Sequence, residues 1–151
     1  MQKRFVLFVL IALAVFGLDQ YIKQLILDGF RYYTACIDII YTLNTGVAFS
    51  MFAFLGDYLK YIQLVIIGAG LIYIYKENLF SRYYVPVAML LGAALANILD
   101  RFVYGGVVDY VFWHCGFDFA VFNFADVMID VAVGLILLIH FNVMEKFRAK
   151  P

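Results

Sequence analysis

The chain has 151 residues, of which 66% are hydrophobic and 15% are charged, and its mean hydropathy is +0.94. This apolar content lies far above the roughly 45–50% of soluble domains, so the composition excludes an ordinary water-soluble protein and indicates an integral membrane protein. The formal net charge of zero also argues against nucleic-acid binding, for which a basic face is expected.

Four apolar segments are long enough, or nearly so, for the roughly 20 residues that a helix needs to cross a bilayer. They cover residues 5–27, 59–75, 83–99 and 127–143. We expect an all-α integral membrane protein with four transmembrane helices, so that both termini lie on one side of the membrane. Residues 1–151 should form a single membrane-embedded domain, because the chain has neither an internal repeat nor a linker rich in Pro, Gly or Ser.

The first apolar segment has an alternative interpretation. Lys3 and Arg4 followed by apolar residues 5–18 also resemble the start of a secretory signal. Beyond that stretch the apolar spacing resumes at Ile22 and Ile26, and no small-x-small cleavage site precedes a polar region. The pattern therefore favours a retained helix.

Basic residues near helix ends bias a segment towards the cytoplasm. The two terminal segments and the middle loop hold seven of the eleven basic residues, whereas the other two loops hold eight aspartates against four basic residues. We therefore expect both termini to be cytoplasmic and the acidic loops to face outside.

Small residues mark places where helices can meet. Gly68 and Gly70 in the second predicted helix, and Gly92 with its alanine neighbours in the third, offer small surfaces that let helices approach closely within lipid. We assign these residues to packing.

Strand-like sequences lie in the outer loops. Residues 37–43 are β-branched and aromatic, and residues 117–122 alternate partly, as half-buried strands do. Residues 107–112 have similar β character but little alternation. We expect a small sheet or hairpin at the outer (periplasmic) surface, with irregular loops as the alternative.

The two cysteines, Cys36 and Cys115, fall on the two outer loops. An oxidising compartment would permit a disulfide between them if the geometry allowed it, but we expect free thiols. With His114 and His140 as the two histidines, the chain has no recognisable zinc pattern. We therefore expect no metal and no cofactor.

Two aspartates can form a catalytic pair. Asp109 lies on the loop after the third predicted helix and Asp126 at the start of the fourth, so the loop between them can bring both carboxylates together. Such a pair shares one proton. The ionised member can then take a proton from water while the protonated member donates to the carbonyl oxygen of an amide. The alternative role for Asp126 is to cap its helix.

Other polar residues near this pair have structural alternatives. Asp19 and Lys23 have the i, i+4 spacing of an ion pair, which we expect near the outer interface with snorkelling side chains. Asp100 and Arg101 are expected to form a structural ion pair at the end of the third helix. Asn97 lies one turn before Arg101 on the same helical face and can hold a loop or a substrate carbonyl.

Five motifs occur in register with the predicted helices between residues 19 and 126. They are Asp19-x-x-x-Lys23, Asn44-Thr45-Gly46-Val47-Ala48-Phe49-Ser50, Gly92-Ala93-x-x-Ala96-Asn97-x-x-Asp100-Arg101, Gly106-Val107-Val108-Asp109-Tyr110 and Phe122-Asn123-x-Ala125-Asp126. Taken together, they resemble the bacterial lipoprotein signal peptidase family, signal peptidase II. Each motif alone is weak evidence, and their order carries the resemblance.

The resemblance implies an aspartyl endopeptidase of the bacterial inner membrane, active near the outer leaflet. Such an enzyme removes the signal peptide from prolipoproteins and cuts before a cysteine that carries diacylglycerol. Asp109 and Asp126 would be its catalytic dyad. Substrate-binding or supporting roles would fall to Asn44, Asn97, Arg101, Asn123, Asp19, Lys23 and Asp100. The expected partners are prolipoproteins and membrane lipid, with the enzyme acting as a monomer.

Asp130 stands outside the family pattern, one helical turn after Asp126. We expect Asp130, in its protonated form, to hydrogen-bond a neighbouring helix. A small transporter or channel is the main alternative to an enzyme, but its acids should lie near the bilayer midplane. Apart from Asp130, the acids cluster at helix ends and outer loops, which favours an enzyme. A non-catalytic membrane assembly factor is the third possibility.

Overall fold

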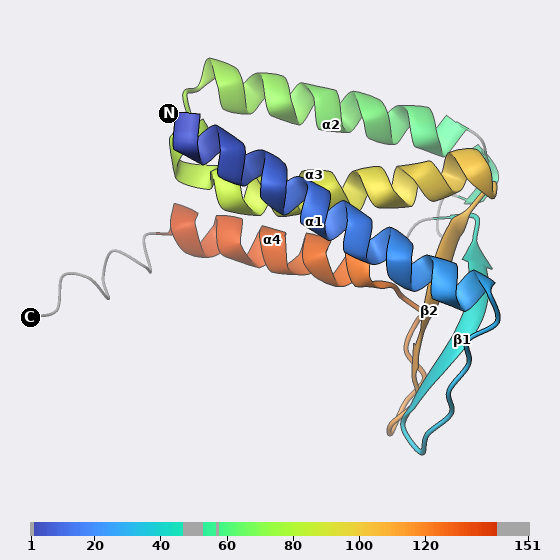
Figure 1. The fold of residues 1–151 in the computed structure, drawn as a ribbon. Coiled ribbons are helices and arrows are strands. Elements are labelled where there is room, and N and C mark those ends of the chain that lie inside the picture. Colours follow the sequence, from blue (N-terminus) through green and yellow to red (C-terminus); the bar gives the residue numbers. More distant parts are fainter. Residues whose placement is uncertain (1, 47–52, 57, 142–151) are drawn as a thin grey trace, which may run out of the picture.

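The structure is a computed structural model that describes residues 2–46, 53–56 and 58–141. The described residues form four α-helices and two strands. The helices run side by side, and the strands extend from one end of the bundle (Figure 1). In chain order the elements are α1 (Gln2–Leu27), β1 (Ile37–Asn44), the 3₁₀ turn η2 (Ala53–Leu55), α2 (Tyr58–Lys76), α3 (Phe80–Val103), β2 (Val107–Trp113) and α4 (Phe124–His140). The N-terminus, the turn between α2 and α3 and the end of α4 lie at the end of the bundle away from the strands (Figure 1).

The central helix is α3, which packs closely against α1 and α4 and less extensively against α2. Gly92 lies where α3 crosses α1, because a Cβ at this position would lie 2.4 Å from the carbonyl oxygen of Ala12. The expected close approach is confirmed here. It is wrong for Gly68 and Gly70 on α2, where a Cβ would meet no described atom within 4 Å. Those two glycines do not lie at a helix contact.

Three helices among the described residues are long and apolar enough to cross a membrane, namely α1, α2 and α3. In their most apolar windows only 11% of α1 and 6% of α2 is buried, compared with 56% of α3. Helices α1 and α2 therefore present apolar side chains outward, as lipid-facing helices do, while α3 is enclosed. Helix α4 has 17 residues and ends at His140, whereas the segment expected for it continues beyond the described residues to position 143.

The two strands form a small antiparallel sheet, as the sequence predicted. Ile37 lies opposite Trp113 and Asn44 opposite Val107, with an irregularity in register between Ile39 and Thr42. This pairing matters for the site because it places the end of β1 beside the start of β2.

Of the three segments with strand-like sequences, two form strands and the third does not. Residues 117–122 form no strand, although Phe122 makes an isolated bridge with Val111. The aromatic residues that alternate in this segment contact one another, because the ring of Phe119 lies edge-on to those of Phe117 and Phe122. The first four residues of β2 are all buried, so both faces of that strand are covered and its sequence has little reason to alternate.

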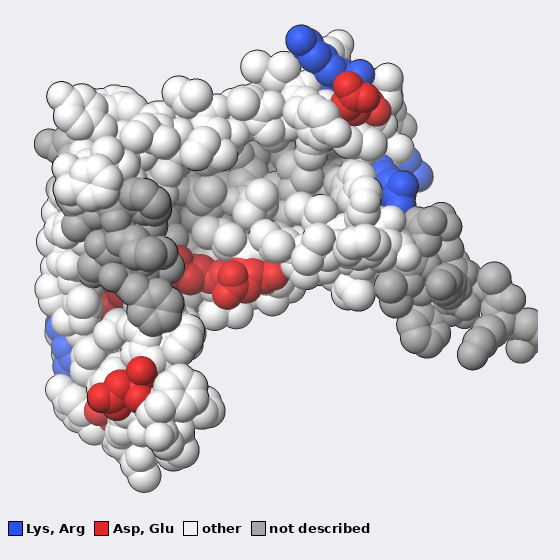
Figure 2. Space-filling view, turned by 180° about the vertical axis from the view of Figure 1, so that it is seen from behind, with Lys and Arg blue, Asp and Glu red and all other residues white. Residues whose placement is uncertain are grey.

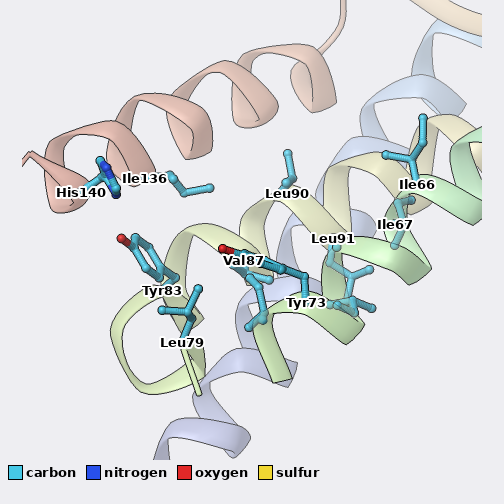
Figure 3. A pocket seen from close by; sticks show the side chains of 13 residues that line it. Ile66, Ile67, Tyr73, Leu79, Tyr83, Val87, Leu90, Leu91, Ile136 and His140 are labelled. Atoms are coloured by element: carbon cyan, nitrogen blue, oxygen red, sulfur yellow. The ribbon is translucent and has the colours of Figure 1, made fainter. Parts of the chain in front are cut away.

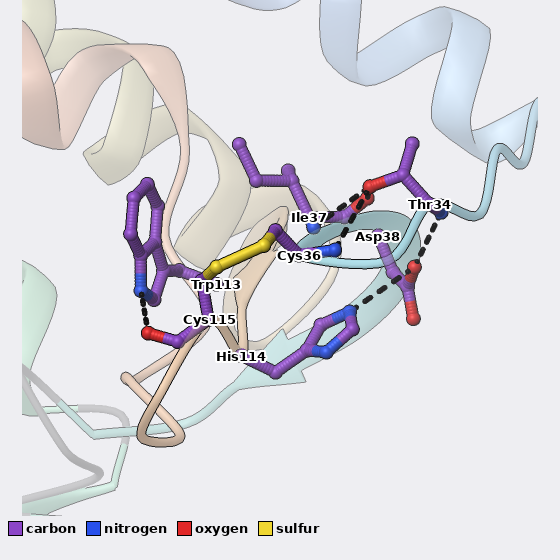
Figure 4. Close-up of a disulfide and its surroundings, with 7 residues drawn as sticks. All are labelled: Thr34, Cys36, Ile37, Asp38, Trp113, His114 and Cys115. Atoms are coloured by element: carbon purple, nitrogen blue, oxygen red, sulfur yellow. Dashed lines mark hydrogen bonds and ion pairs between the residues drawn. A yellow bond between two sulfur atoms is a disulfide. The ribbon is translucent and has the colours of Figure 1, made fainter.

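A disulfide joins Cys36 and Cys115, with their Cα atoms 4.4 Å apart (Figure 4). The expectation of free thiols is therefore wrong. The cysteines are 79 positions apart, but each lies just outside the Ile37–Trp113 pair that ends the sheet. Strand pairing thus brings them together, and the backbone N–H of His114 also donates to the Cys36 carbonyl at 2.9 Å.

Candidate active site

Polar side chains converge where α2, α3 and α4 meet the sheet. They line a hollow of about 600 Å³, which we name the polar hollow. Its polar lining residues are Asn44, Gln63, Asn97, Arg101, Asp109, Asp126 and Asp130. A row of acidic side chains lies along a recess on this face of the molecule (Figure 2). An apolar bundle therefore carries one strongly polar recess near its sheet.

Asp109 lies on β2 and is 2% exposed. Its two carboxylate oxygens are held separately. Oδ1 accepts a hydrogen bond from Asn123 Nδ2 at 2.7 Å, and Oδ2 accepts one from Asn44 Nδ2 at 3.0 Å. Because Asn44 ends β1 and Asp109 lies near the start of β2, the sheet register fixes this contact.

Asp126 lies in the first turn of α4 and forms a capping box with Asn123. Asn123 Oδ1 accepts from the Asp126 backbone N–H at 2.9 Å, and Asp126 Oδ2 accepts from the Asn123 backbone N–H at 3.1 Å. The capping alternative is thus confirmed. It leaves Asp126 Oδ1 to accept from Asn97 Nδ2 at 2.9 Å inside the polar hollow. One carboxylate both caps the helix and lines the site.

Asn123 connects the two aspartates. Its side-chain amide donates to Asp109 through Nδ2, while its Oδ1 accepts from the backbone of Asp126. Asn123 is fully buried, so this bridge lies beneath the floor of the hollow. The structure therefore brings together the two carboxylates that the sequence paired.

A buried lysine lies behind this arrangement. The ammonium nitrogen of Lys23 is 2.7 Å from a carboxylate oxygen of Asp19, 2.7 Å from one of Asp100 and 2.7 Å from Asn97 Oδ1. Lys23 is 1% exposed and Asp19 is fully buried. The expectation of a snorkelling pair at the interface is wrong, because the packing of α1 on α3 encloses both residues.

These buried acids also fix neighbouring backbone. Asp19 Oδ1 accepts from the backbone N–H of Ala125 at 2.8 Å, which connects α1 to the first turn of α4. Asp100 Oδ2 accepts from the backbone N–H of Val108 at 3.1 Å, which connects α3 to β2. Each aspartate thus positions the segment that carries one member of the pair.

The expected ion pair between Asp100 and Arg101 is not formed. Asp100 faces α1 and pairs with Lys23, whereas Arg101 lines the polar hollow and donates from a terminal guanidinium nitrogen to the carbonyl of Gly46. Adjacent helical residues point about 100° apart, so the two side chains reach different surroundings. Arg101 therefore holds the backbone of Gly46, two residues after the end of β1.

The pKa of Asp109 is raised to about 6. Burial contributes most, because it disfavours the ionised form, and the nearby negative charge of Asp126 raises the pKa further. Hydrogen bonds from Asn44 and Asn123 act in the opposite direction. This carboxyl can therefore hold a proton close to neutral pH, as an acid pair sharing one proton requires.

Sequence reasoning missed two glutamines. Gln20 on α1 donates to Asp100 Oδ1 at 2.9 Å and to the Ala96 carbonyl at 3.3 Å. Gln63 on α2 lines the polar hollow. Both could have been found from the sequence, because each is an amide within an otherwise apolar helix. Such groups are costly in lipid unless they have a partner.

Asp130 is exposed and lines the polar hollow, and it has no hydrogen-bond partner among the described residues. The expected bond to a neighbouring helix is wrong, because this face of α4 borders the recess. Within the described part of the chain, no group of three His, Cys, Asp or Glu side chains is arranged to hold a metal ion.

A second hollow of about 420 Å³ lies between α2, α3 and α4 (Figure 3). We name it the apolar hollow. Its lining is almost wholly aliphatic and aromatic, as shown by Leu79, Val87, Leu90 and Ile136, and it contains no carboxylate. Its lining includes His140 but no pair of carboxylates like Asp109 and Asp126, so it lacks two acids that could share one proton.

The chain is similar to known proteins along most of its length. The family model described as Signal peptidase (SPase) II matches residues 11–142. A lipoprotein signal peptidase of Sulfurimonas denitrificans is 59% identical over 128 residues, which are 85% of this chain and 83% of the relative. One from Helicobacter pylori strain Shi470 is 50% identical over 146 residues, which are 96% and 93% of the two chains. A bacterial membrane enzyme solved by the in meso method at 2.3 Å resolution aligns with a TM-score of 0.77 and 27% identity, over 95% of this chain and 93% of that one.

Proposed function

This chain belongs to the signal peptidase II family, and from that premise we propose that it is an aspartyl endopeptidase with Asp109 and Asp126 as its catalytic dyad. Family membership itself makes it a bacterial membrane protease that processes lipoprotein precursors. The observation that carries the proposal is that Asn123 donates to both carboxylates, to Asp109 from its side-chain amide and to Asp126 from its backbone N–H, and that both carboxylates line one hollow.

The dyad acts on a water molecule held between its carboxyl groups. The ionised carboxylate takes a proton from this water as the water oxygen attacks the scissile carbonyl carbon, and the protonated carboxyl donates its proton to the carbonyl oxygen. The resulting tetrahedral diol collapses when its C–N bond breaks. The ionised carboxylate takes a proton from one hydroxyl of the diol, and the protonated carboxyl gives its proton to the leaving amine nitrogen. The dyad therefore regains its starting state with one shared proton. Because the two groups titrate as a pair, neither is assigned the acid role alone.

Amides and buried charges keep the dyad in position. The ammonium of Lys23 donates to Asn97 Oδ1, which turns the NH₂ group of Asn97 towards Asp126. Asn44 and Asn123 hold Asp109 in the same way. We propose a monomer as the working unit.

The substrate of this proposal is a prolipoprotein whose cysteine carries diacylglycerol, cut immediately before that cysteine. Both termini would be cytoplasmic and the sheet would lie on the outer face of the inner membrane. The basic residues of the terminal segments and middle loop support this orientation, and a disulfide at the sheet suits an oxidising compartment. Helix α4 would be a fourth crossing, since its 17 residues span about 25 Å.

Cleavage of a defined precursor tests the proposal. The purified protein in detergent should release the signal peptide from a diacylglyceryl-modified prolipoprotein, and mass spectrometry should place the cut directly before the modified cysteine. The same precursor without the lipid is the matched control and should be cut far more slowly. A well-folded preparation that releases no signal peptide would contradict the proposed function.

A further inference from the structure

Helix α2 carries one amide in an apolar stretch. Between Lys60 and Lys76, tyrosines apart, Gln63 is the one polar side chain. A lipid-facing helix gains nothing from such a group, because an unpaired amide in an apolar setting is costly. Gln63 instead lines the polar hollow, across from the residues of α4 and β2 that hold the dyad.

The amide oxygen of Gln63 is buried and has no hydrogen-bond partner in the described part of the chain. Buried polar atoms in folded proteins are nearly always paired, so an unpaired acceptor facing a recess indicates a donor supplied from outside. Gln63 lies outside the five motifs that carried the family resemblance.

A matching donor lines the same hollow. Arg101 Nε is also buried without a partner among the described residues, while a terminal nitrogen of this guanidinium is used by the Gly46 carbonyl. Among the described residues, the polar hollow thus has a buried unused acceptor on α2 and a buried unused donor on α3, beside the exposed carboxylate of Asp130. A polypeptide backbone offers the complement, since each residue other than proline has one N–H donor and one C=O acceptor.

We propose that Gln63 is a substrate-binding residue whose amide oxygen accepts a hydrogen bond from a backbone N–H of the segment being cut. Arg101 Nε donates to a backbone carbonyl of the same segment. Recognition of this kind reads the backbone and not the side chains, so it holds different precursor sequences in one position over the dyad. This inference rests on the proposed function and adds a residue to it.

Replacement of Gln63 by methionine tests the contact, because methionine keeps the length of the side chain and removes the amide. With a synthetic diacylglyceryl lipopeptide as substrate, Gln63→Met should raise KM roughly tenfold, as expected for loss of one buried hydrogen bond, and should change kcat little. Gln24→Leu is the control, because Gln24 pairs with Asp28 on an exposed face and should leave both constants unchanged. KM does not depend on the amount of active enzyme, so partial misfolding of the variant cannot imitate the result.

Backbone substitution in the substrate identifies the partner. A series of lipopeptides, each with one amide before the cut replaced by an ester, lacks one N–H at a time. One ester should raise KM for the wild-type protein but not for Gln63→Met, since both changes remove the same bond. If every ester affects the two proteins equally, or if KM is unchanged in Gln63→Met, a water molecule fills this position and the inference is wrong. Failure of the wild-type protein to cut any lipopeptide would instead overturn the proposed function on which it rests.

Discussion

The polar hollow and the apolar hollow are built from the same three helices and differ about 1.4-fold in volume, with 600 Å³ against 420 Å³. Their linings have opposite character. Three aspartates face one of them, whereas no carboxylate faces the other. In a membrane protein a recess between helices is thus not by itself a site, because lipid or an apolar side chain can fill it. The candidate site is instead distinguished by its carboxylates and amides, because these groups need partners other than lipid.

The difference arises from what the sheet adds. At one end of the bundle β2 brings Asp109 beside α4, and the end of β1 brings Asn44 to Asp109. At the other end α2 and α3 are joined by a short turn that contributes Leu79 to the apolar hollow. Identical helices therefore enclose chemically different spaces, depending on which connection closes each end.

The largest effect should follow removal of either carboxylate from the polar hollow. Asp109→Asn and Asp126→Asn keep the side-chain shape but prevent the pair from sharing a proton, so cleavage should fall on the order of 10³-fold or more. Initial rates on the lipid-modified precursor measure the loss. Asp118→Asn, on an exposed loop, should retain full activity. If either dyad variant cut at close to the wild-type rate, the acid-pair mechanism would be wrong.

The next effect concerns the buried cation behind the polar hollow. Lys23→Met leaves Asp19 and Asp100 as uncompensated buried charges, so the free energy of unfolding should fall by about 3–5 kcal/mol. Equilibrium unfolding in detergent measures this loss. Lys76→Met, exposed at the other end of the bundle, is the matched control. Equal effects of the two substitutions would show that the buried network contributes nothing particular.

A smaller effect should appear as a dependence of stability on pH. The pKa of Asp109 is raised to about 6 in the folded protein, so the folded state binds this proton more tightly than the unfolded chain, whose Asp pKa is about 3.9. Tighter binding of this proton stabilises the folded state fully below about pH 4, and the stabilisation is lost as pH rises through about 6. The free energy of unfolding should fall by up to about 3 kcal/mol over this range. Unfolding measured between pH 4 and 7 should show this decline. Asp109→Asn should make this decline shallower, and a variant that keeps the same slope would contradict the assignment.

The smallest effect should come from filling the apolar hollow. Val131→Phe and Ile136→Phe place the same ring from the same helix into the polar and the apolar hollow respectively. The first should raise KM about fivefold or more by occupying substrate space, and the second should change KM less than about twofold. Steady-state cleavage of one precursor by both variants measures the contrast. A larger effect of Ile136→Phe would reverse the roles assigned to the two recesses.

Local sequence predicted the features that depend on one segment. Runs of apolar residues located the helices, although α3 begins at Phe80, three residues before the expected position. The spacing of Asp109 and Asp126 around a loop predicted their meeting. In both cases the determining forces are hydrophobic length and chain connectivity, which a single sequence displays directly.

Features that depend on contacts between segments were predicted poorly. Burial of Lys23 requires α1 to pack on α3, and the bond between Cys36 and Cys115 requires a strand register across 79 positions. The absence of alternation in β2 reflects burial on both faces, which only the assembled fold reveals. The unused amide of Gln63 is likewise visible only once α2 is seen to border the polar hollow.

The separation of β1 from β2 along the chain also has a consequence for biosynthesis. Asn44 is translated early, but its partner Asp109 follows 65 residues later, after α2 and α3. A ribosome that has completed α3 has produced neither member of the proposed dyad, and Asp126 arrives only with the final helix. With this dyad, the nascent enzyme would be inert throughout its insertion and would become a protease only when its last helix enters the bundle.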